Sequence, residues 1–220
     1  MKYTNYFIIL LFLSLLSCKK SILEDNNPIV IPTVIDTPDP LELKDGVTIP
    51  TNDLKRLIPS NYKKSHFAIY KKKDGTELKF KIDFKDSVKI DRELNSIKYF
   101  SDQFYAVLYS EDIDYILRVR GNANFGTPSE IIKGITYNIT TKKASISGTA
   151  YMGKDKQLDK EDPFNRYTAQ KEFNEKMFKD IFFTKFVNVI GYSELVYNTE
   201  FGIVAYRDEN DEYVVFDRFE

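Results

Sequence analysis

The sequence predicts a mainly β protein in which an antiparallel meander forms a two-layer sandwich or a barrel-like sheet. Runs of alternating polarity begin near His66 and recur toward the C-terminus, as in strands that bury one face. Turn signals rich in Asp, Asn and Gly separate these runs. Hydrophobic residues make up 42% of the chain and aromatic residues 15%, so one domain can build its core without disulfides.

The first 17 residues have the order of a secretory signal, and we expect them to be removed as a signal peptide. Lys2 supplies positive charge, an apolar run from Phe7 to Leu16 follows, and the small residue Ser17 precedes Cys18. The run has about half of the roughly 20 apolar residues that cross a bilayer, which disfavours an uncleaved anchor.

Residues Leu15-Leu16-Ser17-Cys18 resemble the lipobox of bacterial lipoproteins. In that family the cysteine receives a diacylglyceryl group, a peptidase cuts between the positions of Ser17 and Cys18, and the new terminus is acylated, for example with palmitate. Cys18 is the only cysteine in the chain, which favours this interpretation over a plain secretory signal. The resemblance implies a cell-envelope protein anchored to a membrane through Cys18. Lys19-Lys20 leave the inner and outer membranes both open, and we expect the outer.

Residues 18–59 are expected to form a proline-rich tether. Six of the eight prolines lie here, and closely spaced prolines favour extended chain over helix or sheet. The alternative is that the β-branched runs Ile29-Val30-Ile31 and Val34-Ile35 dock on the domain as edge strands. Residues 60–220 are then a single β-rich domain.

The first two strands are predicted on either side of a hairpin turn at Asp74-Gly75, because this pair tolerates the positive φ that such turns require. The return strand alternates strictly from Glu77 to Phe84. Its apolar residues should face the core, and Lys79, Lys81 and Asp83 should face water.

Phe104–Tyr109 is apolar on both faces, which predicts a central strand covered on both sides. The next strand is expected at Tyr115–Arg120. Gly121–Pro128 is rich in Gly and Asn and is expected to be a loop. Two further strands are expected at Gly134–Thr140 and Ala144–Tyr151.

One covering helix is expected near residues 163–181. Asp162-Pro163 can cap and begin a helix, and Phe173, Met177 and Ile181 follow at helical spacing. This stripe should pack against the sheet.

Three runs close the chain, at Phe186–Ile190, Val196–Tyr206 and Tyr213–Phe216, with Gly202 as a break in the second. Together they resemble the closing meander of many small β-rich lipoproteins of the Bacteroidetes type. The resemblance departs from that pattern at Asp208–Glu212, where a glycine is usual. It implies a β architecture and carries over no functional residues.

Few residues carry recognisable chemistry, and we assign no catalytic, cofactor-binding or metal-binding residue. His66 is the only histidine, which excludes a multi-histidine zinc site, and no Gly-x-Ser-x-Gly motif is present. Acidic groups at Glu111–Asp114 and Asp208–Glu212 could hold calcium, but they also fit ordinary turns. Arg118 and Arg120 share a strand face and could bind an anion; the alternative is two solvated arginines.

The charge balance, 32 Lys and Arg against 33 Asp and Glu, leaves no basic footprint for nucleic acid. We therefore expect a membrane-anchored envelope lipoprotein that needs no cofactor. It would display a β-rich domain for structural contacts or for binding an envelope partner. The alternatives are a carboxylate-dependent hydrolase and a carrier of a small apolar ligand.

Overall fold

The computed structural model of the protein describes residues 41–110, 113–141, 145–162, 166–185 and 194–220. These residues belong to the unit Pro40–Glu220, and the fold below is that of this unit alone. The signal peptide, the tether as far as residue 40 and the run Phe186–Ile190 lie outside the described residues.

The prediction of a mainly β fold is confirmed, because the described residues form a twelve-stranded sheet and only two short helical segments. In chain order the elements are β1 (Thr48–Ile49), the 3₁₀ helix η1 (Asn52–Leu57), α2 (Asn61–Lys64), β2 (Phe67–Lys71), β3 (Glu77–Leu94), β4 (Ile97–Tyr109), β5 (Ile116–Thr127), β6 (Glu130–Thr140), β7 (Ser145–Tyr151), β8 (Tyr167–Phe173), β9 (Lys176–Lys185), β10 (Glu194–Asn198), β11 (Gly202–Arg207) and β12 (Tyr213–Phe219).

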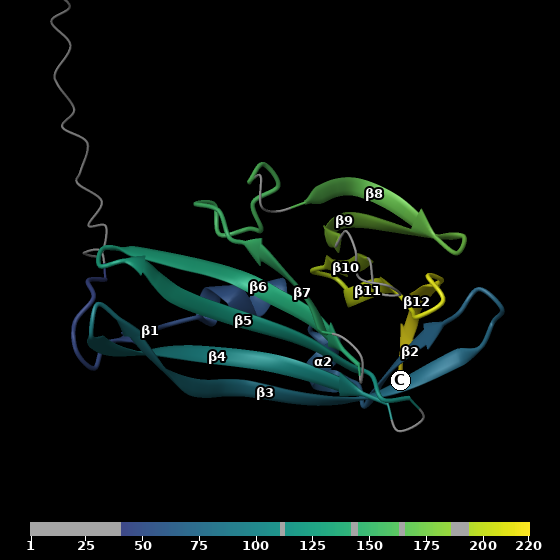
Figure 1. Ribbon diagram of the computed structural model, residues 1–220, viewed down its shortest axis with the longest axis horizontal. Helices are drawn as coiled ribbons and strands as arrows, with labels where there is room; N and C mark the ends of the chain where they lie inside the picture. Colours follow the sequence, from purple (N-terminus) through teal and green to yellow (C-terminus); the bar gives the residue numbers. More distant parts are fainter. Residues whose placement is uncertain (1–40, 111–112, 142–144, 163–165, 186–193) are drawn as a thin grey trace, which may run out of the picture. The chain divides into compact units, whose positions relative to one another are not determined.

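The main path of the sheet is β7-β6-β5-β4-β3-β2-β12-β11-β10-β9-β8, with antiparallel neighbours throughout. The chain runs outward from β2 to the edge strand β7, crosses to the other edge at β8, and returns to pair β12 with β2. The sheet curls into a half-barrel (Figure 1), in which Tyr137 of β6 stacks on Tyr197 of β10 with ring centroids 5.1 Å apart.

The main core lies inside this curl and includes η1 and α2. Leu54, Leu57 and Tyr62 are buried there. The Tyr197 hydroxyl donates a hydrogen bond to the Leu57 carbonyl, which ties η1 to β10. Gly202 has φ +86°, and a Cβ at this position would collide with the Tyr62 ring. The glycine break predicted here is therefore the turn that leads into β11, and it also makes room for α2.

A second core forms where β4 and β5 diverge. β4 and β5 pair between Phe104–Tyr109 and Ile116–Gly121. Before Phe104 the two strands separate, and β1 pairs with β4 in the gap, at Phe100 and Ser101. Its five buried residues are Leu43, Ile49, Tyr99, Ala123 and Phe125.

This second core corrects the expected extent of the tether. Residues 41–59, its last part, pack against the sheet, because Leu43 and Ile49 fill the gap between the diverging strands and Leu54 and Leu57 enter the main core. Proline spacing carried no information about these burial partners, which come from distant strands.

The expected helix near 163–181 is wrong, since the described part of this segment forms the hairpin β8–β9. Asn174 and Glu175 both have positive φ, 44° and 65°, as a two-residue hairpin turn requires. Phe173 and Ile181 are buried, whereas Met177 is 50% exposed. The three apolar residues therefore do not share one face, although their spacing matches a helix.

The expected loop at Gly121–Pro128 is also wrong, because β5 continues to Thr127. A Cβ on Gly121 would lie 2.2 Å from Cζ of Phe104, so this glycine allows the Phe104 ring to pack on β5. Ala123 and Phe125 then belong to the second core. Other strand predictions are confirmed: β3 alternates as expected, and β6 and β7 cover the runs expected after residue 134.

The apolar run Phe104–Tyr109 lies in β4 but is covered on one face only. Ala106 and Leu108 are fully buried, while Tyr105, Val107 and Tyr109 are half-buried. By contrast, every residue of β10 and all but the last of β11 are buried, so these strands are covered on both faces.

Candidate functional site

A shallow groove of about 390 Å³ lies over one face of β4, β5, β6 and β7. Strand register builds it from two rows of side chains. One row passes from Tyr105 through Arg120 to Thr136, and the next from Val107 through Arg118 and Asn138 to Ser147. Because residues two apart on a strand point to the same face, all of these side chains reach the same surface. The shared face predicted for Arg118 and Arg120 is confirmed.

The groove carries positive charge that no carboxylate balances. None of the lining residues among the described part of the chain is acidic. Arg118 donates a hydrogen bond to Oγ1 of Thr140 at 3.1 Å, whereas Arg120 has no hydrogen bond or ion pair to any described residue. Arg120 is exposed, but partial desolvation by the groove wall lowers its pKa, and the nearby positive charge of Arg92 adds to this effect.

Neutral polar groups surround the two arginines. Asn122 donates to Oγ1 of Thr136 at 2.7 Å, and that hydroxyl lies 3.2 Å from Oγ1 of Thr149. These three side chains form a hydrogen-bonded ladder across β5, β6 and β7. Asn138 and Ser147 make no hydrogen bond to a described side chain or main-chain group. The groove thus combines free hydrogen-bond donors with uncompensated positive charge.

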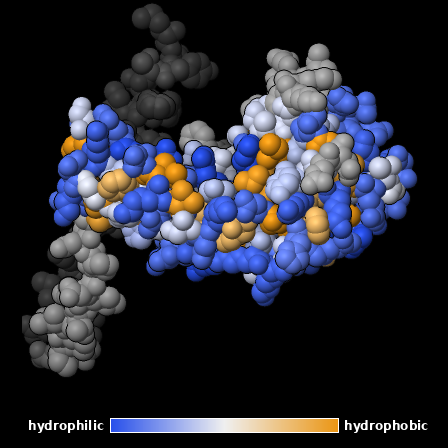
Figure 2. All heavy atoms as spheres, turned by 90° about the horizontal axis from the view of Figure 1, so that it is seen from below, coloured by the Kyte–Doolittle hydropathy of each residue, from blue (hydrophilic) through white to orange (hydrophobic). Residues whose placement is uncertain are grey.

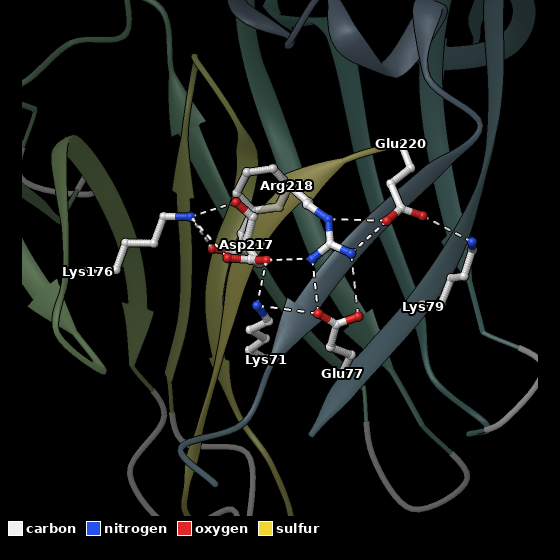
Figure 3. A network of polar contacts seen from close by, with 8 residues as sticks. Lys71, Glu77, Lys79, Lys176, Asp217, Arg218 and Glu220 are labelled. Atoms are coloured by element: carbon white, nitrogen blue, oxygen red, sulfur yellow. Dashed lines mark hydrogen bonds and ion pairs between the residues drawn. The ribbon is translucent and has the colours of Figure 1, made fainter. Parts of the chain in front are cut away.

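A second polar cluster, on β2, β3 and β12, has the opposite character (Figure 3). We call it the C-terminal network: Lys71, Glu77, Lys79, Asp217, Arg218 and Glu220. Its three cations face three carboxylates, and Arg218 contacts all three of these carboxylates at 2.7–3.0 Å. Lys176 from β9 donates to the main-chain carbonyls of Phe216 and Asp217 at 3.0 and 2.6 Å. These contacts tie the last strand to its neighbours.

The network also explains the pKa values of its carboxylates. Hydrogen bonds from Arg218 and Lys71 lower the pKa of Glu77, and those from Lys79 and Arg218 lower the pKa of Glu220. For Asp217, partial burial opposes the shift, yet bonds from Lys71 and Arg218 still leave its pKa below the ordinary value. A saturated cluster of this kind is structural.

A buried carboxylate at the start of β10 is likewise satisfied. Glu194 is 6% exposed; its Oε1 lies 2.7 Å from Nζ of Lys171, and Tyr213 donates to its Oε2 at 2.9 Å. Arg207 donates in turn to the Tyr213 hydroxyl at 3.2 Å. These contacts compensate the buried charge and connect β8 with β10, β11 and β12.

The acidic turn Asp208–Glu212 needs no metal to hold its shape. The Asp208 carboxylate accepts hydrogen bonds from the main-chain N–H groups of Asn210 and Glu212 and lies 3.2 Å from Nζ of Lys72. Among the described residues, no three or more His, Cys, Asp or Glu side chains gather closely enough to hold a metal ion. Glu111 and Asp112, from the other acidic group, lie outside the described residues.

His66 is exposed at the start of β2, and its main-chain N–H donates to the Glu220 carbonyl. Ser17 and Cys18 lie outside the described residues. Within the part of the chain that the structure describes, no helix is long and apolar enough to cross a membrane. The face shown in Figure 2 is mainly hydrophilic, with its apolar residues in small separate groups.

Comparison with known proteins adds no identification: no protein-family model, no curated protein and no solved structure matches this chain.

Proposed function

We propose that this protein is a lipid-anchored component of a bacterial cell envelope, at the outer membrane, and that its β domain serves in binding rather than catalysis. Support for the anchor comes from the signal-like order of residues 1–17 and from a unique cysteine directly after Ser17. The domain would be held at the membrane through Cys18 and residues 19–40.

The observation that carries the binding role is the groove over β4–β7. In the C-terminal network, by contrast, Arg218 is paired with three carboxylates. Within the groove, Arg120 has no acceptor among the described residues and no carboxylate lines the wall. An anionic ligand would give the Arg120 guanidinium a charge-assisted hydrogen bond that the described chain does not provide.

No observation favours the two alternatives. A glycosidase-type acid needs a raised carboxyl pKa. The pKa shifts resolved among the described carboxyls, at Asp74, Glu77, Asp86, Asp180, Asp217 and Glu220, are all downward. A carrier of apolar ligands would need an apolar cavity, whereas tyrosine rings such as Tyr62, Tyr70 and Tyr197 fill the main core.

The anchor is tested by feeding cells a labelled fatty acid. We expect label in the wild-type chain and none in Cys18→Ser, which lacks the thiol that accepts the lipid. Blotting of membrane and soluble fractions should show that this variant leaves the membrane fraction. A labelled Cys18→Ser chain, or an unlabelled wild-type chain, would overturn the anchor.

A further inference from the structure

We propose that the groove over β4–β7 binds an oxyanion, a phosphate or carboxylate group carried on a small hydroxylated molecule, through Arg118 and Arg120. The inference names the ligand class of the binding domain proposed above and so rests on its binding role. It does not depend on the lipid anchor.

The positions of the two guanidinium groups suit such a ligand. Arg118 and Arg120 are two residues apart on β5, so their Cα atoms are separated by roughly 6–7 Å and their side chains leave the same face. A guanidinium presents its N–H groups in a planar fork that matches the oxygens of a carboxylate or phosphate. One oxyanion placed between the two side chains can accept from both.

Arg120 differs from most other arginines of the described chain. Arg56 donates to the Lys156 carbonyl, Arg207 to Tyr213, and Arg218 to three carboxylates. Arg120 and the nearby Arg92 have no acceptor among the described residues, and Nε of Arg92 is buried. An anion in the groove would supply an acceptor to Arg120 and reduce the repulsion between Arg120 and Arg92, which itself lies outside the groove lining.

The neutral groups indicate what else the ligand carries. Tyr105, Asn138 and Ser147 lie beside the arginines and make no hydrogen bond to a described residue. Tyr105 is the direct cross-strand neighbour of Arg120, so its ring adjoins the proposed anion position. A hydroxyl, an amide and a phenol favour a ligand with hydroxyl oxygens in addition to its charged group, and the ring provides an apolar surface for the carbon skeleton.

The test is a calorimetric titration of the full mature chain with four probes: inorganic phosphate, glucose 6-phosphate, glucuronate and glucose. We expect saturable binding of glucose 6-phosphate, of glucuronate or of both, no binding of glucose, and weaker affinity at higher salt. Preference for one of the two acids identifies phosphate or carboxylate as the recognised group. Saturation by none of the probes, or equal binding of glucose, would overturn the proposal.

Two variants assign the site. Arg120→Gln removes the charge that lacks a partner and should weaken binding by about tenfold or more, as expected for loss of a charge-assisted hydrogen bond. Lys73→Gln removes one exposed charge from the β2–β3 turn and should leave affinity unchanged. Thermal melts should show that both variants fold like the wild-type chain. Equal weakening in both variants, or none in Arg120→Gln, would contradict the assignment. Neither result would alter fatty-acid labelling at Cys18, so this proposal can fail independently of the anchor.

Discussion

The C-terminal network and the groove over β4–β7 are both polar surfaces of the same sheet, but they differ in whether their charged side chains are paired. In the network, Arg218 lies within 3.0 Å of an oxygen of each of its three carboxylates and ties β12 to β3 through Glu77, while Lys71 of β2 pairs with Asp217 of β12. In the groove, Arg120 meets no carboxylate among the described residues, and the neighbouring positive charge is Arg92. Balanced charge indicates a role in folding, and unbalanced charge indicates a role in binding.

The largest expected effect tests whether the groove face of β4 is separate from the core beneath it. Leu108 is fully buried, and Leu108→Ala should cost about 2–5 kcal/mol of unfolding free energy. Val107, on the groove face, is half-buried, so Val107→Ala should cost far less. Denaturant melts of both variants measure the difference. Equal losses would mean that the groove face is part of the core, which contradicts its assignment as a binding surface.

A smaller effect concerns the two arginines. Arg218→Gln should lower the thermal midpoint because three carboxylates lose their shared partner. Arg120→Gln should leave it unchanged, since no described residue pairs with this side chain. Melting curves at neutral pH make the comparison directly. A lower midpoint for Arg120→Gln alone would reverse the roles assigned to the two regions.

Acid should expose the same contrast. The pKa values of Glu77 and Glu220 are lowered by their bonds in the folded state, so this stabilisation is complete above their ordinary pKa of 4.5 and is lost as the pH falls through the lowered values. In this window, the unfolding free energy of the wild-type chain and of Arg120→Gln should therefore decrease as the pH is lowered. The fall should be shallower for Arg218→Gln, and identical slopes in all three proteins would show that the network contributes nothing.

The sequence predicted those parts of the fold that depend on local alternation. The predicted burial of Leu78 and Phe80 is confirmed, because one face of β3 is solvent-exposed and a turn signal directly precedes the strand. The helix near residues 163–181 was wrongly predicted because the spacing of Phe173, Met177 and Ile181 also fits a helix. In addition, the turn at Asn174-Glu175 lacks the glycine that usually marks a hairpin.

Other features depend on contacts between distant residues. Ile49 is buried only because β4 and β5 separate, which a proline-rich segment does not reveal. The common face of Arg118 and Arg120 follows from their spacing, but the register that adds Tyr105, Thr136 and Asn138 joins three strands. Polar residues alternating along residues 134–140 were the available signal for Thr136 and Asn138, and no local pattern could align them with β5.

The central claim, that the groove arginines await a ligand while Arg218 is committed to the fold, is most directly tested by the Nε–Hε signals of the arginines in ¹⁵N NMR spectra of the full mature chain. Titration with glucose 6-phosphate or glucuronate, whichever binds, should shift the Arg118 and Arg120 signals saturably and leave Arg218 in place. Small, non-saturating shifts of all three signals, or a shift of Arg218 alone, would contradict the account.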